Sequence, residues 1–421
     1  MRWAQPLQQT HRWRADELHT EDLDDPSDLG IYLSTQRRRA GWTQEQLAAR
    51  SGVSIRTVRN LETGSITNPR RSSVRLLLEA FEEQEIPPAE AGADALIGRS
   101  TDFQHVQEAL RRARHVVLTG PGGVGKTMLA LAVARHLRPR LREQTAVISL
   151  GSFPAETPGL DDQFDAVWAA INDALASSSP GAHPAGHELL LVLDNAEHLV
   201  RSVSRAFQRL FVDHPGVRVL VTSRRPLPIA FMHVWDVRPL DVEPAGDGLL
   251  PDATLLFLRR AQANCPTLDL SGSLAAVTEL CRRLDGIPAL IELAARRIRS
   301  MSLDTLLGIY SLTRVLGQMS QSAYSPHRSL SDSVRWSVEL LTESQTEMLQ
   351  RLALFDTSFT LDELQQHAID CLADPNGLAD MLSELIDSSL VQVSRESPYV
   401  YRLYGHLREY LRWQQVSHQA R

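Results

Sequence analysis

The only lysine among the 421 residues is Lys126, and it lies in the octet Gly120-Pro121-Gly122-Gly123-Val124-Gly125-Lys126-Thr127. The octet reads G-x-x-x-x-G-K-T, which is the pattern of a phosphate-binding loop. Its glycines let backbone N–H groups turn inward around phosphates, Lys126 brings a mobile ammonium to the outer phosphates, and Thr127 offers a hydroxyl to Mg²⁺. All the other residues of the Lys and Arg types are arginines. Lysine therefore occurs only at the position where this chemistry needs it.

The segments on either side of the octet follow the order that such a loop requires. His115–Thr119 predicts a strand that enters the loop, and Met128–Leu137 predicts a helix that leaves it. We therefore predict a site for ATP or ADP with Mg²⁺. The predicted nucleotide contacts in this stretch are Gly120, Gly122, Gly123, Val124, Gly125, Lys126, Thr127 and Met128. The alternative is a glycine-rich turn that binds nothing.

Two later apolar runs supply further candidate residues. Glu188–Asn195 predicts a buried parallel strand, and Asp194 near its carboxyl end is a candidate magnesium-organising carboxylate beside Thr127. Val217–Thr222 predicts another strand, after which Arg224 would lie near the terminal phosphate. The alternative for Arg224 is a surface arginine at a strand end. The predicted catalytic residues are Lys126, Asp194 and Arg224.

Composition limits the class of protein. An apolar fraction of 43% is ordinary for soluble globular proteins, and the length suggests two to four domains. The cysteines Cys265, Cys281 and Cys371 have no metal or disulfide spacing, which favours a reducing cytoplasm. We predict no signal peptide and no membrane span, because no apolar run is long enough for either.

The charge is distributed unevenly along the chain. The net charge is −7, yet residues 30–76 contain nine arginines and only two acids, Glu45 and Glu62. A basic segment in an acidic chain suggests a polyanionic partner.

The same segment has the pattern of a helix-turn-helix. Ile31–Ala40 predicts a first helix, and Thr43 with Gln46 forms a capping box for a second helix that ends near Ser51. Ser54 caps a third helix over Ile55–Glu62, in which the apolar side chains face inward.

Residues 30–84 resemble the Cro-repressor-like (Xre) family of DNA-binding domains through the pattern Gln44-x-x-Leu47-Ala48-x-x-x-Gly52-Val53-Ser54-x-x-Thr57-Val58-x-x-Leu61-Glu62-x-Gly64. The resemblance implies contact with double-stranded DNA, through the major groove for the second and third helices and through phosphates for the flanking arginines. The predicted DNA contacts are Arg37, Arg38, Gln44, Ser54, Ile55, Arg56, Arg59, Asn60, Arg70 and Arg71. The alternative is a protein-docking module with solvated arginines.

We predict a multidomain chain of α and α/β class. Its predicted parts are a flexible leader (1–28), a helix-turn-helix domain (29–86), a linker (87–95), a parallel α/β nucleotide-binding domain (96–245), a helical lid domain (246–320) and a winged-helix domain (321–421). The lid helices are predicted over Ala253–Asn264, Ser271–Leu284 and Pro288–Met301.

Several signatures occur in one order: Gly98-Arg99, the phosphate loop, Leu191-Val192-Leu193-Asp194-Asn195-Ala196-Glu197-His198-Leu199, Thr222-Ser223-Arg224 and Leu284-Asp285-Gly286-Ile287-Pro288-Ala289-Leu290. From residue 95 to about 412 this series resembles the STAND class of signal-transduction ATPases, in its NB-ARC-like branch of bacterial transcription regulators. The resemblance implies that Arg99 and Arg224 contact nucleotide, that Asp194 organises magnesium, and that Pro288 packs on adenine. It also implies a C-terminal winged helix that acts as a switch element.

Two departures from that family pattern affect the expected activity. Asn195 stands where most P-loop hydrolases keep a second, water-activating carboxylate, and Glu197 or His198 are only weak substitutes, so we expect slow hydrolysis. Tyr404 and Gly405 stand where relatives carry a histidine and an acid that sense bound diphosphate.

We predict a cytoplasmic DNA-binding transcription regulator that ATP and ADP switch, with self-association on activation and a signal partner acting in trans. One rival is a defence or stress-signalling ATPase whose helix-turn-helix is a docking adaptor. Another is a DNA-loading ATPase of the AAA+ type.

Overall fold

The structure is a computed structural model of the whole chain. It describes residues 30, 33–34, 37, 43–51, 53–63, 65–66, 73–74, 77, 96–137, 145–156, 163–177, 189–244, 246, 249–309, 330–368, 375–395 and 397–419. The chain divides into two compact units, residues 1–89 and 90–421. The predicted leader and linker, and the contacts predicted for Arg38, Arg70 and Arg71, lie outside the described residues.

The first unit, called the head below, has a small helical core. Helix α2 is Gln44–Ser51 and helix α3 is Ile55–Glu62. The predicted capping box is present, because Gln46 N donates to Thr43 Oγ1 at 3.2 Å and Thr43 N donates to Gln46 Oε1 at 2.7 Å. The buried side chains that form the core are Leu33, Leu47, Val53, Val58, Leu61 and Leu77.

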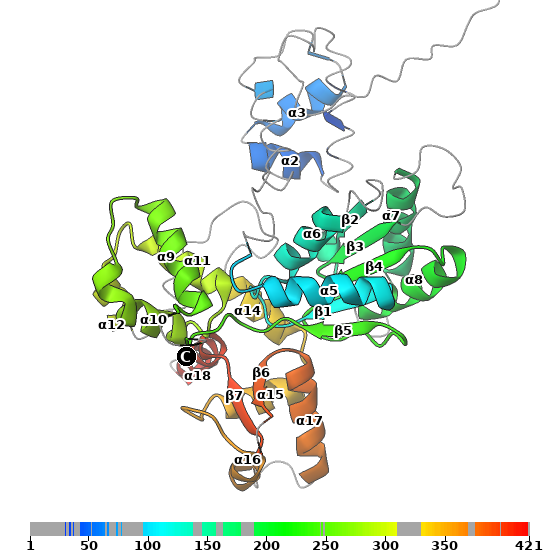
Figure 1. The fold of residues 1–421 in the computed structure, drawn as a ribbon. Coiled ribbons are helices and arrows are strands. Elements are labelled where there is room, and N and C mark those ends of the chain that lie inside the picture. Colours follow the sequence, from blue (N-terminus) through cyan, green and yellow to red (C-terminus); the bar gives the residue numbers. More distant parts are fainter. Residues whose placement is uncertain are drawn as a thin grey trace, which may run out of the picture. The chain divides into compact units, whose positions relative to one another are not determined.

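The second unit contains a parallel five-stranded sheet in the order β2-β3-β4-β1-β5 (Figure 1). The strands are β1 (His115–Thr119), β2 (Thr145–Ser149), β3 (Leu190–Asp194), β4 (Arg218–Thr222) and β5 (His233–Asp236). Parallel strands bring their carboxyl ends to one edge of the sheet. The ends of β1, β3 and β4 therefore place the phosphate loop, Asp194 and the residues after Thr222 along that edge.

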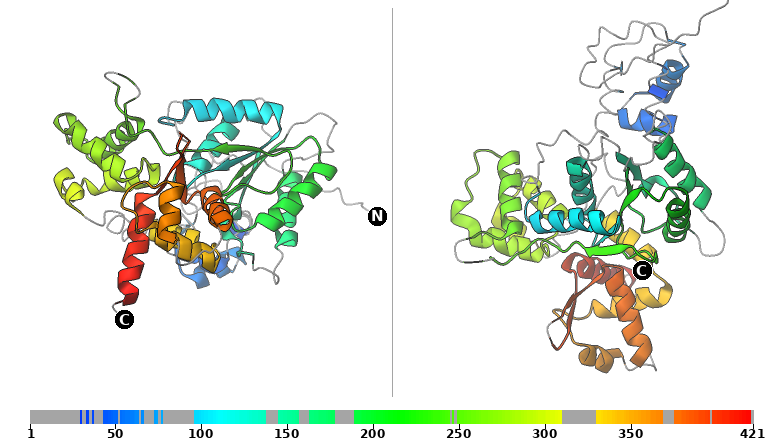
Figure 2. Two further views of the ribbon diagram at one scale, coloured as in Figure 1. Left: turned by 90° about the horizontal axis from the view of Figure 1, so that it is seen from below. Right: turned by 45° about the vertical axis from the view of Figure 1, so that its right-hand side comes forward.

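Helices cover both faces of this sheet (Figures 1 and 2). Leu191 and Leu193 pack in one apolar cluster with α7 and α8, whereas Leu190 and Val192 pack in the other with α5 and α6. The covering helices are α5 (Ser100–Arg112), α6 (Lys126–Leu137), α7 (Phe164–Ser177) and α8 (Val200–Asp213). Burial on both faces explains why the strands read as continuous apolar runs rather than as alternating ones.

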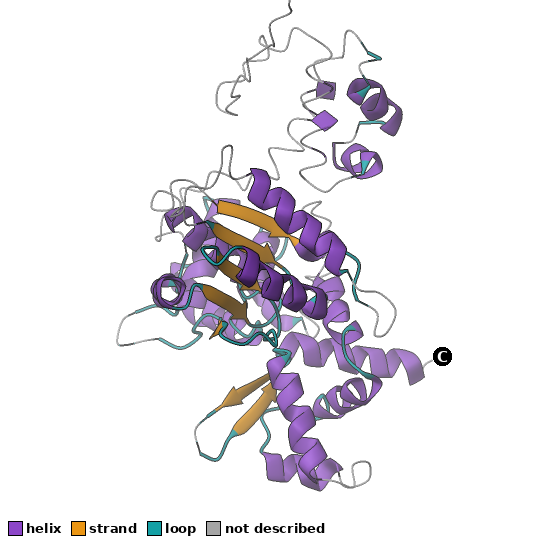
Figure 3. Cartoon of the chain, turned by 90° about the vertical axis from the view of Figure 1, so that its right-hand side faces the viewer, coloured by secondary structure: helices purple, strands orange, loops and turns teal. Residues whose placement is uncertain are grey.

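Beyond the sheet, helices and one antiparallel hairpin share a single apolar cluster (Figure 3). The helical segment that follows the sheet contains α9 (Asp252–Asn264), α10 (Leu274–Arg283), α11 (Pro288–Arg297) and α12 (Leu303–Gly308). The C-terminal region, residues 330–419, contains α14 (Leu330–Glu339), α15 (Glu343–Leu352), α16 (Leu361–Ala368), α17 (Pro375–Asp387), β6 (Val391–Ser394), β7 (Val400–Leu403) and α18 (Gly405–Gln419).

The multidomain α and α/β class is confirmed, with three differences in detail. The predicted helix Ser271–Leu284 begins as a 3₁₀ turn, Ser271–Ser273, and only Leu274–Arg283 is α-helical. Helix α11 ends at Arg297, four residues before the predicted end. Helices α8 and α12 are among those that were not predicted from the sequence. No helix among the described residues is long and apolar enough to cross a membrane.

Candidate nucleotide and DNA sites

The phosphate loop has the backbone that its glycines permit. Gly120, Gly123 and Gly125 have φ values of 137°, 78° and 104°, in the region that L-residues with side chains rarely adopt. A Cβ on Gly120 would lie 2.4 Å from the Val237 carbonyl oxygen. Val124, with 0% exposure, anchors the loop in the apolar core below it.

Lys126 begins α6, and its ammonium turns back onto the loop. Nζ donates to the carbonyl oxygens of Gly120 at 2.8 Å and Pro121 at 2.9 Å. Desolvation lowers the pKa of Lys126 to about 8, while the carboxylate of Glu197 opposes that shift more than any other charge does. The cation that would meet phosphates is therefore held in place by the loop's own carbonyl groups.

Hydroxyl and carboxylate oxygens meet where β3 and β4 end. Thr127 Oγ1 donates to Asp194 Oδ1 at 2.7 Å, and Thr222 Oγ1 donates to the same oxygen at 2.6 Å. Such hard oxygen ligands suit Mg²⁺, which a protein commonly holds through one or two side chains together with substrate phosphates. The donor set formed by Thr127 and Asp194 fits that metal. Among the described residues, no group of three or more His, Cys, Asp or Glu side chains is arranged to hold a metal ion.

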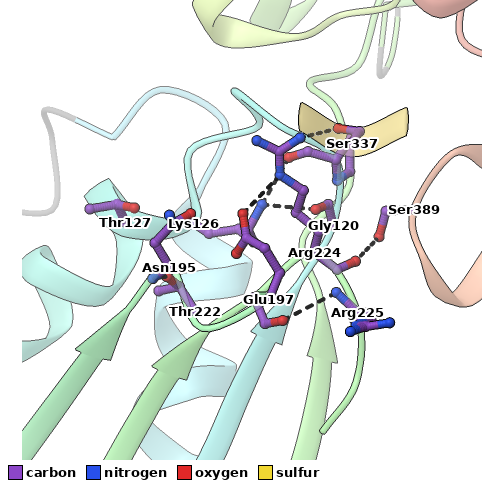
Figure 4. A network of polar contacts seen from close by, with 12 residues as sticks. Gly120, Lys126, Thr127, Asn195, Glu197, Thr222, Arg224, Arg225, Ser337 and Ser389 are labelled. Carbon is purple, nitrogen blue, oxygen red and sulfur yellow. Dashed lines mark hydrogen bonds and ion pairs between the residues drawn. The ribbon is translucent and has the colours of Figure 1, made fainter. Parts of the chain in front are cut away.

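Arg224 follows β4 and is buried among polar partners (Figure 4). Its Nε donates to Glu197 Oε1 at 3.0 Å, and one terminal nitrogen donates to Ser337 Oγ of the C-terminal region. Ser389 Oγ donates to the Arg224 carbonyl oxygen at 2.6 Å. Arg224 thus lies at the predicted edge of the sheet, but its guanidinium is engaged by a carboxylate and a hydroxyl.

Arg99 lies under the loop rather than in front of it. Arg99 is only 7% exposed. Its guanidinium donates to the carbonyl oxygens of Val124 at 2.8 Å and Arg238 at 2.7 Å and pairs with Asp102. These bonds hold the loop against the chain segment that leaves β5. A direct contact of Arg99 with nucleotide remains a prediction.

The predicted lid turn touches the phosphate loop. Ala289 N, next to Pro288 at the start of α11, donates to the Gly123 carbonyl oxygen at 3.1 Å. Gly286 has φ of 65°, and a Cβ there would lie 2.1 Å from the Leu240 carbonyl oxygen. Only glycine fits this turn, and the turn brings Pro288 to the loop. Met128, at 49% exposure, is open to solvent on α6.

The candidate DNA-binding surface is on α2 and α3 of the head. Arg56 and Arg59 are exposed on α3, whereas Ile55 and Asn60 are partly buried. Ser54, the exposed N-cap of α3, accepts a hydrogen bond from Thr57 N at 3.2 Å. An exposed row of this kind is what contact with a polyanion requires.

Other predicted DNA contacts are engaged inside the head. Arg37 Nε pairs with Glu62 Oε1 at 2.6 Å, and the two side chains are only 12% and 5% exposed. Gln44 Nε2 donates to Glu62 Oε2, and Arg59 bonds to both Gln44 and Glu45. Gln44 therefore ties α2 to α3, and Arg37, which precedes α2, is also tied to α3; contact of either residue with DNA remains a prediction.

Residues 28–86 match a family model described as "Helix-turn-helix domain". The Mycobacterium tuberculosis protein Rv0894 is 30% identical over 337 residues, which cover 75% of this chain and 80% of that protein. This chain belongs to the Rv0894 family.

This Rv0894-family protein is also similar to a second M. tuberculosis protein and to one solved structure. "Putative HTH-type transcriptional regulator Rv0890c" of M. tuberculosis is 33% identical over 287 residues, which cover 67% of this chain and 31% of that protein. The chain thus spans about a third of the length of that relative. The solved structure of the Walker-type ATPase PABY2304 of Pyrococcus abyssi has a TM-score of 0.52 at 14% identity and covers 76% of this chain and 97% of its own. That likeness shows the fold alone.

Sequence reasoning missed the residues that the C-terminal region of this Rv0894-family protein brings to the loop. Ser337, Ser389 and His406 line a small crevice with Pro121 and Gly122. The predicted positions of the diphosphate-sensing pair are Tyr404 and Gly405, whereas the histidine at the start of α18 is His406. A search that tolerated a shift of one or two positions would have found it.

Asp285 of the lid turn meets the same C-terminal region. Its buried carboxylate accepts a hydrogen bond from Gly405 N at 2.6 Å and lies 3.4 Å from Arg402 and 3.6 Å from His406 Nδ1. Asp285 has φ of 54°, so the turn that presents this carboxylate is itself unusual for a residue with a side chain. The phosphate loop, the helical segment and the C-terminal region are thereby joined by direct polar contacts.

Proposed function

We propose that this chain is a DNA-binding transcription regulator of the STAND class, NB-ARC-like branch, whose DNA binding depends on whether ATP or ADP occupies the phosphate loop. One observation carries the proposal. The loop touches the helical segment through Gly123 and Ala289, while Arg224 at the neighbouring strand end touches the C-terminal region through Ser337. A ligand at this edge would alter contacts among three parts of the chain at once.

Nucleotide binding is supported by the fit of the loop to phosphates. Its backbone has the required positive φ values, Lys126 lies on it, and Thr127 and Asp194 provide oxygen ligands for Mg²⁺. When bound, Mg²⁺ would supply positive charge to the phosphates. Arg99 supports the loop from below, and Pro288, whose neighbour Ala289 bonds to the loop, would pack on the base.

DNA binding is supported by the head. Its helix-turn-helix match, the exposed Arg56 and Arg59 on α3, and the excess of arginine in this segment agree with contact to a duplex. The name of the relative Rv0890c points the same way. The docking-adaptor rival is favoured by one observation, the internal pairing of Arg37 and Arg59, which removes part of the positive charge from the candidate surface.

The switch is a shift between two populations of the chain. Nucleotide can favour one arrangement of the phosphate loop, lid and winged helix only by binding it more tightly than the other. Release of the C-terminal region, which we identify as the winged helix, would free surfaces for self-association. Pairing two heads would then raise the affinity for DNA through effective concentration. Hydrolysis, slow in this class of switch, would reset it.

The proposal is tested by isolating the full chain and identifying any nucleotide released on denaturation. Duplexes are then selected from a random library with the same preparation. We expect ADP or ATP in near-stoichiometric amount and enrichment of one short sequence. Absence of nucleotide binding would contradict the switch. Nucleotide binding without duplex enrichment would favour the docking adaptor.

A further inference from the structure

A buried acidic side chain, Glu197, lies at the nucleotide edge beside Arg224. The residue is 1% exposed and comes three positions after Asp194. Its carboxylate accepts the Arg224 bond at 3.0 Å. Asn195 lies beside Glu197 (Figure 4). With the Asn195 amide turned so that its nitrogen faces the carboxylate, Asn195 Nδ2 donates to the two oxygens at 2.8 and 3.1 Å.

The backbone between Asp194 and Glu197 turns sharply. This turn explains why Glu197, three residues after Asp194, still lies at the nucleotide edge of the sheet. Asn195 has φ of 67°, and this left-handed residue turns the chain directly after β3. Asn195 N and Ala196 N, both at 2.9 Å, then donate to the Thr222 side chain and carbonyl oxygen, respectively. The turn is fixed to β4, and Glu197 is directed toward Arg224.

Glu197 lies between two groups of the nucleotide edge, the Arg224 guanidinium and the Asn195 amide. Because Arg224 follows β4 at the edge that carries the phosphate loop, we expect the outer phosphate and its attacking water close to this carboxylate. Asn195, at the position of the usual second acid, can orient this carboxylate but cannot take up a proton.

We propose that Glu197 is the general base for ATP hydrolysis and that the C-terminal region restrains it through Arg224. This inference rests on the proposed ATP binding. In the hydrolysis step, the water oxygen bonds to the γ-phosphorus while the bond from that phosphorus to the bridging oxygen of ADP breaks. The electron pair of the broken bond stays on ADP, and the proton of the water passes to a Glu197 carboxylate oxygen before release to solvent.

The Arg224 ion pair holds this base inactive. The Arg224 Nε–H occupies Glu197 Oε1, so a water molecule must displace this bond before that oxygen can accept its proton. Arg224 is itself held by the C-terminal region at two points, Ser337 Oγ on α14 and Ser389 Oγ after α17. Undocking of this region would remove both contacts and let the guanidinium leave Glu197 for the phosphate.

An aromatic contact offers a readout that is independent of hydrolysis. His198, next to Glu197, packs edge-on against Trp336 on α14, with ring centroids 5.6 Å apart. Movement of α14 relative to the strand end would change the surroundings of this indole. The fluorescence of Trp336 would therefore report docking, provided that the signal is assigned with a Trp336→Phe variant.

The test compares single-turnover ATP hydrolysis in the full-length wild type, Glu197→Gln, Glu197→Asp, Ser337→Ala and Ser337→Ala/Glu197→Gln. Ser383→Ala, an exposed serine on α17, is the matched control for serine removal. Binding of a non-hydrolysable ATP analogue, thermal unfolding and Trp336 fluorescence are measured in parallel. We expect Glu197→Gln to lower the hydrolysis rate about a hundredfold or more with analogue affinity within roughly threefold of wild type.

Ser337→Ala should raise the hydrolysis rate about fivefold or more and shift Trp336 fluorescence, and the double variant should be as slow as Glu197→Gln. Glu197→Asp, which keeps the charge, should retain part of the rate and controls for misfolding of the amide variant. Wild-type hydrolysis in a folded Glu197→Gln protein that binds the analogue would overturn this inference alone, as would an unchanged rate in Ser337→Ala. Failure of the wild type to bind ATP would overturn the proposed function as well.

Discussion

The cations of the nucleotide edge and Arg56 of the head differ in what they touch. Lys126 and Arg224 are bonded to loop carbonyls, a carboxylate and a serine, whereas Arg56 on α3 is exposed. A bonded cation must exchange partners before it can hold a ligand, so ligand binding there is coupled to the rest of the unit. An exposed cation can meet a polyanion directly, so its contribution depends mainly on ionic strength.

The largest expected effect tests the coupled side of this comparison. Lys126→Ala removes the cation that lies on the loop and should weaken nucleotide binding by about 4–5 kcal/mol, enough to abolish co-purification of nucleotide. Released nucleotide is measured by chromatography. Arg112→Ala, an exposed residue on α5, is the control and should retain nucleotide. Unchanged nucleotide content in Lys126→Ala would refute the assignment of the site.

A core substitution in the head tests whether the two units unfold independently. Leu47 is fully buried on α2, and Leu47→Ala should lower the free energy of unfolding of the head by about 3 kcal/mol. Duplex binding should fall with it, while nucleotide content of the second unit stays the same. Calorimetry measures the unfolding of the head, and nucleotide release from the same sample measures the nucleotide content. Loss of nucleotide together with the head would show that the two units do not unfold independently.

The exposed side of the comparison is tested at Arg56. Arg56→Ala should weaken binding to the selected duplex by about 1–3 kcal/mol without changing nucleotide affinity. Titrations at several salt concentrations separate a base contact from a phosphate contact, since only the latter lowers the salt dependence. If Arg56→Ala changes the affinity for no duplex, the docking-adaptor function is favoured.

The smallest effect concerns pH. The pKa of Lys126 is lowered to about 8, below that of a lysine in the unfolded chain, because desolvation disfavours the charged form. Between pH 8 and about 10.4 the unfolded state binds more protons, so the stability of the nucleotide-free unit should rise with pH across this window. Nucleotide affinity should fall over the same range, because phosphates need the charged amine.

That pKa can be measured directly because the chain has one lysine. Selective ¹³C labelling of lysine gives a single side-chain resonance to titrate in the nucleotide-free protein. A midpoint near 8 is expected without nucleotide and a higher one with it. A midpoint above 10 without nucleotide would mean that the amine is solvated rather than held on the loop carbonyls.

Local features of this protein could be predicted from the sequence, and contacts across the chain could not. The capping box of Thr43, the strand before the loop and the acid that ends β3 depend on neighbours within a few residues. The partners of Arg224 lie 27 and 113 positions away, at Glu197 and Ser337. No periodicity encodes such a pairing, because tertiary packing selects it.

Helix α8 and the loop-supporting role of Arg99 were not predicted, for two different reasons. Helix α8 has an amphipathic pattern, with buried Val203, Phe207 and Leu210 at helical spacing, so a closer reading would have found it. The nucleotide contact of Arg99 remains a prediction from its position in the sequence, whereas its support of the loop could not be predicted. The structure gives it Val124 and Arg238 as backbone partners, which only the folded chain brings together.

The central claim is that nucleotide state changes DNA affinity through contacts at one edge of the sheet. The most direct measurement is the affinity of one full-length preparation for its selected duplex, first loaded with ADP and then with a non-hydrolysable ATP analogue at the same salt concentration. We predict a difference of about tenfold, within the usual range of coupling between two sites, and its loss in Lys126→Ala. Equal affinities of the ADP and analogue forms for the duplex would contradict the account.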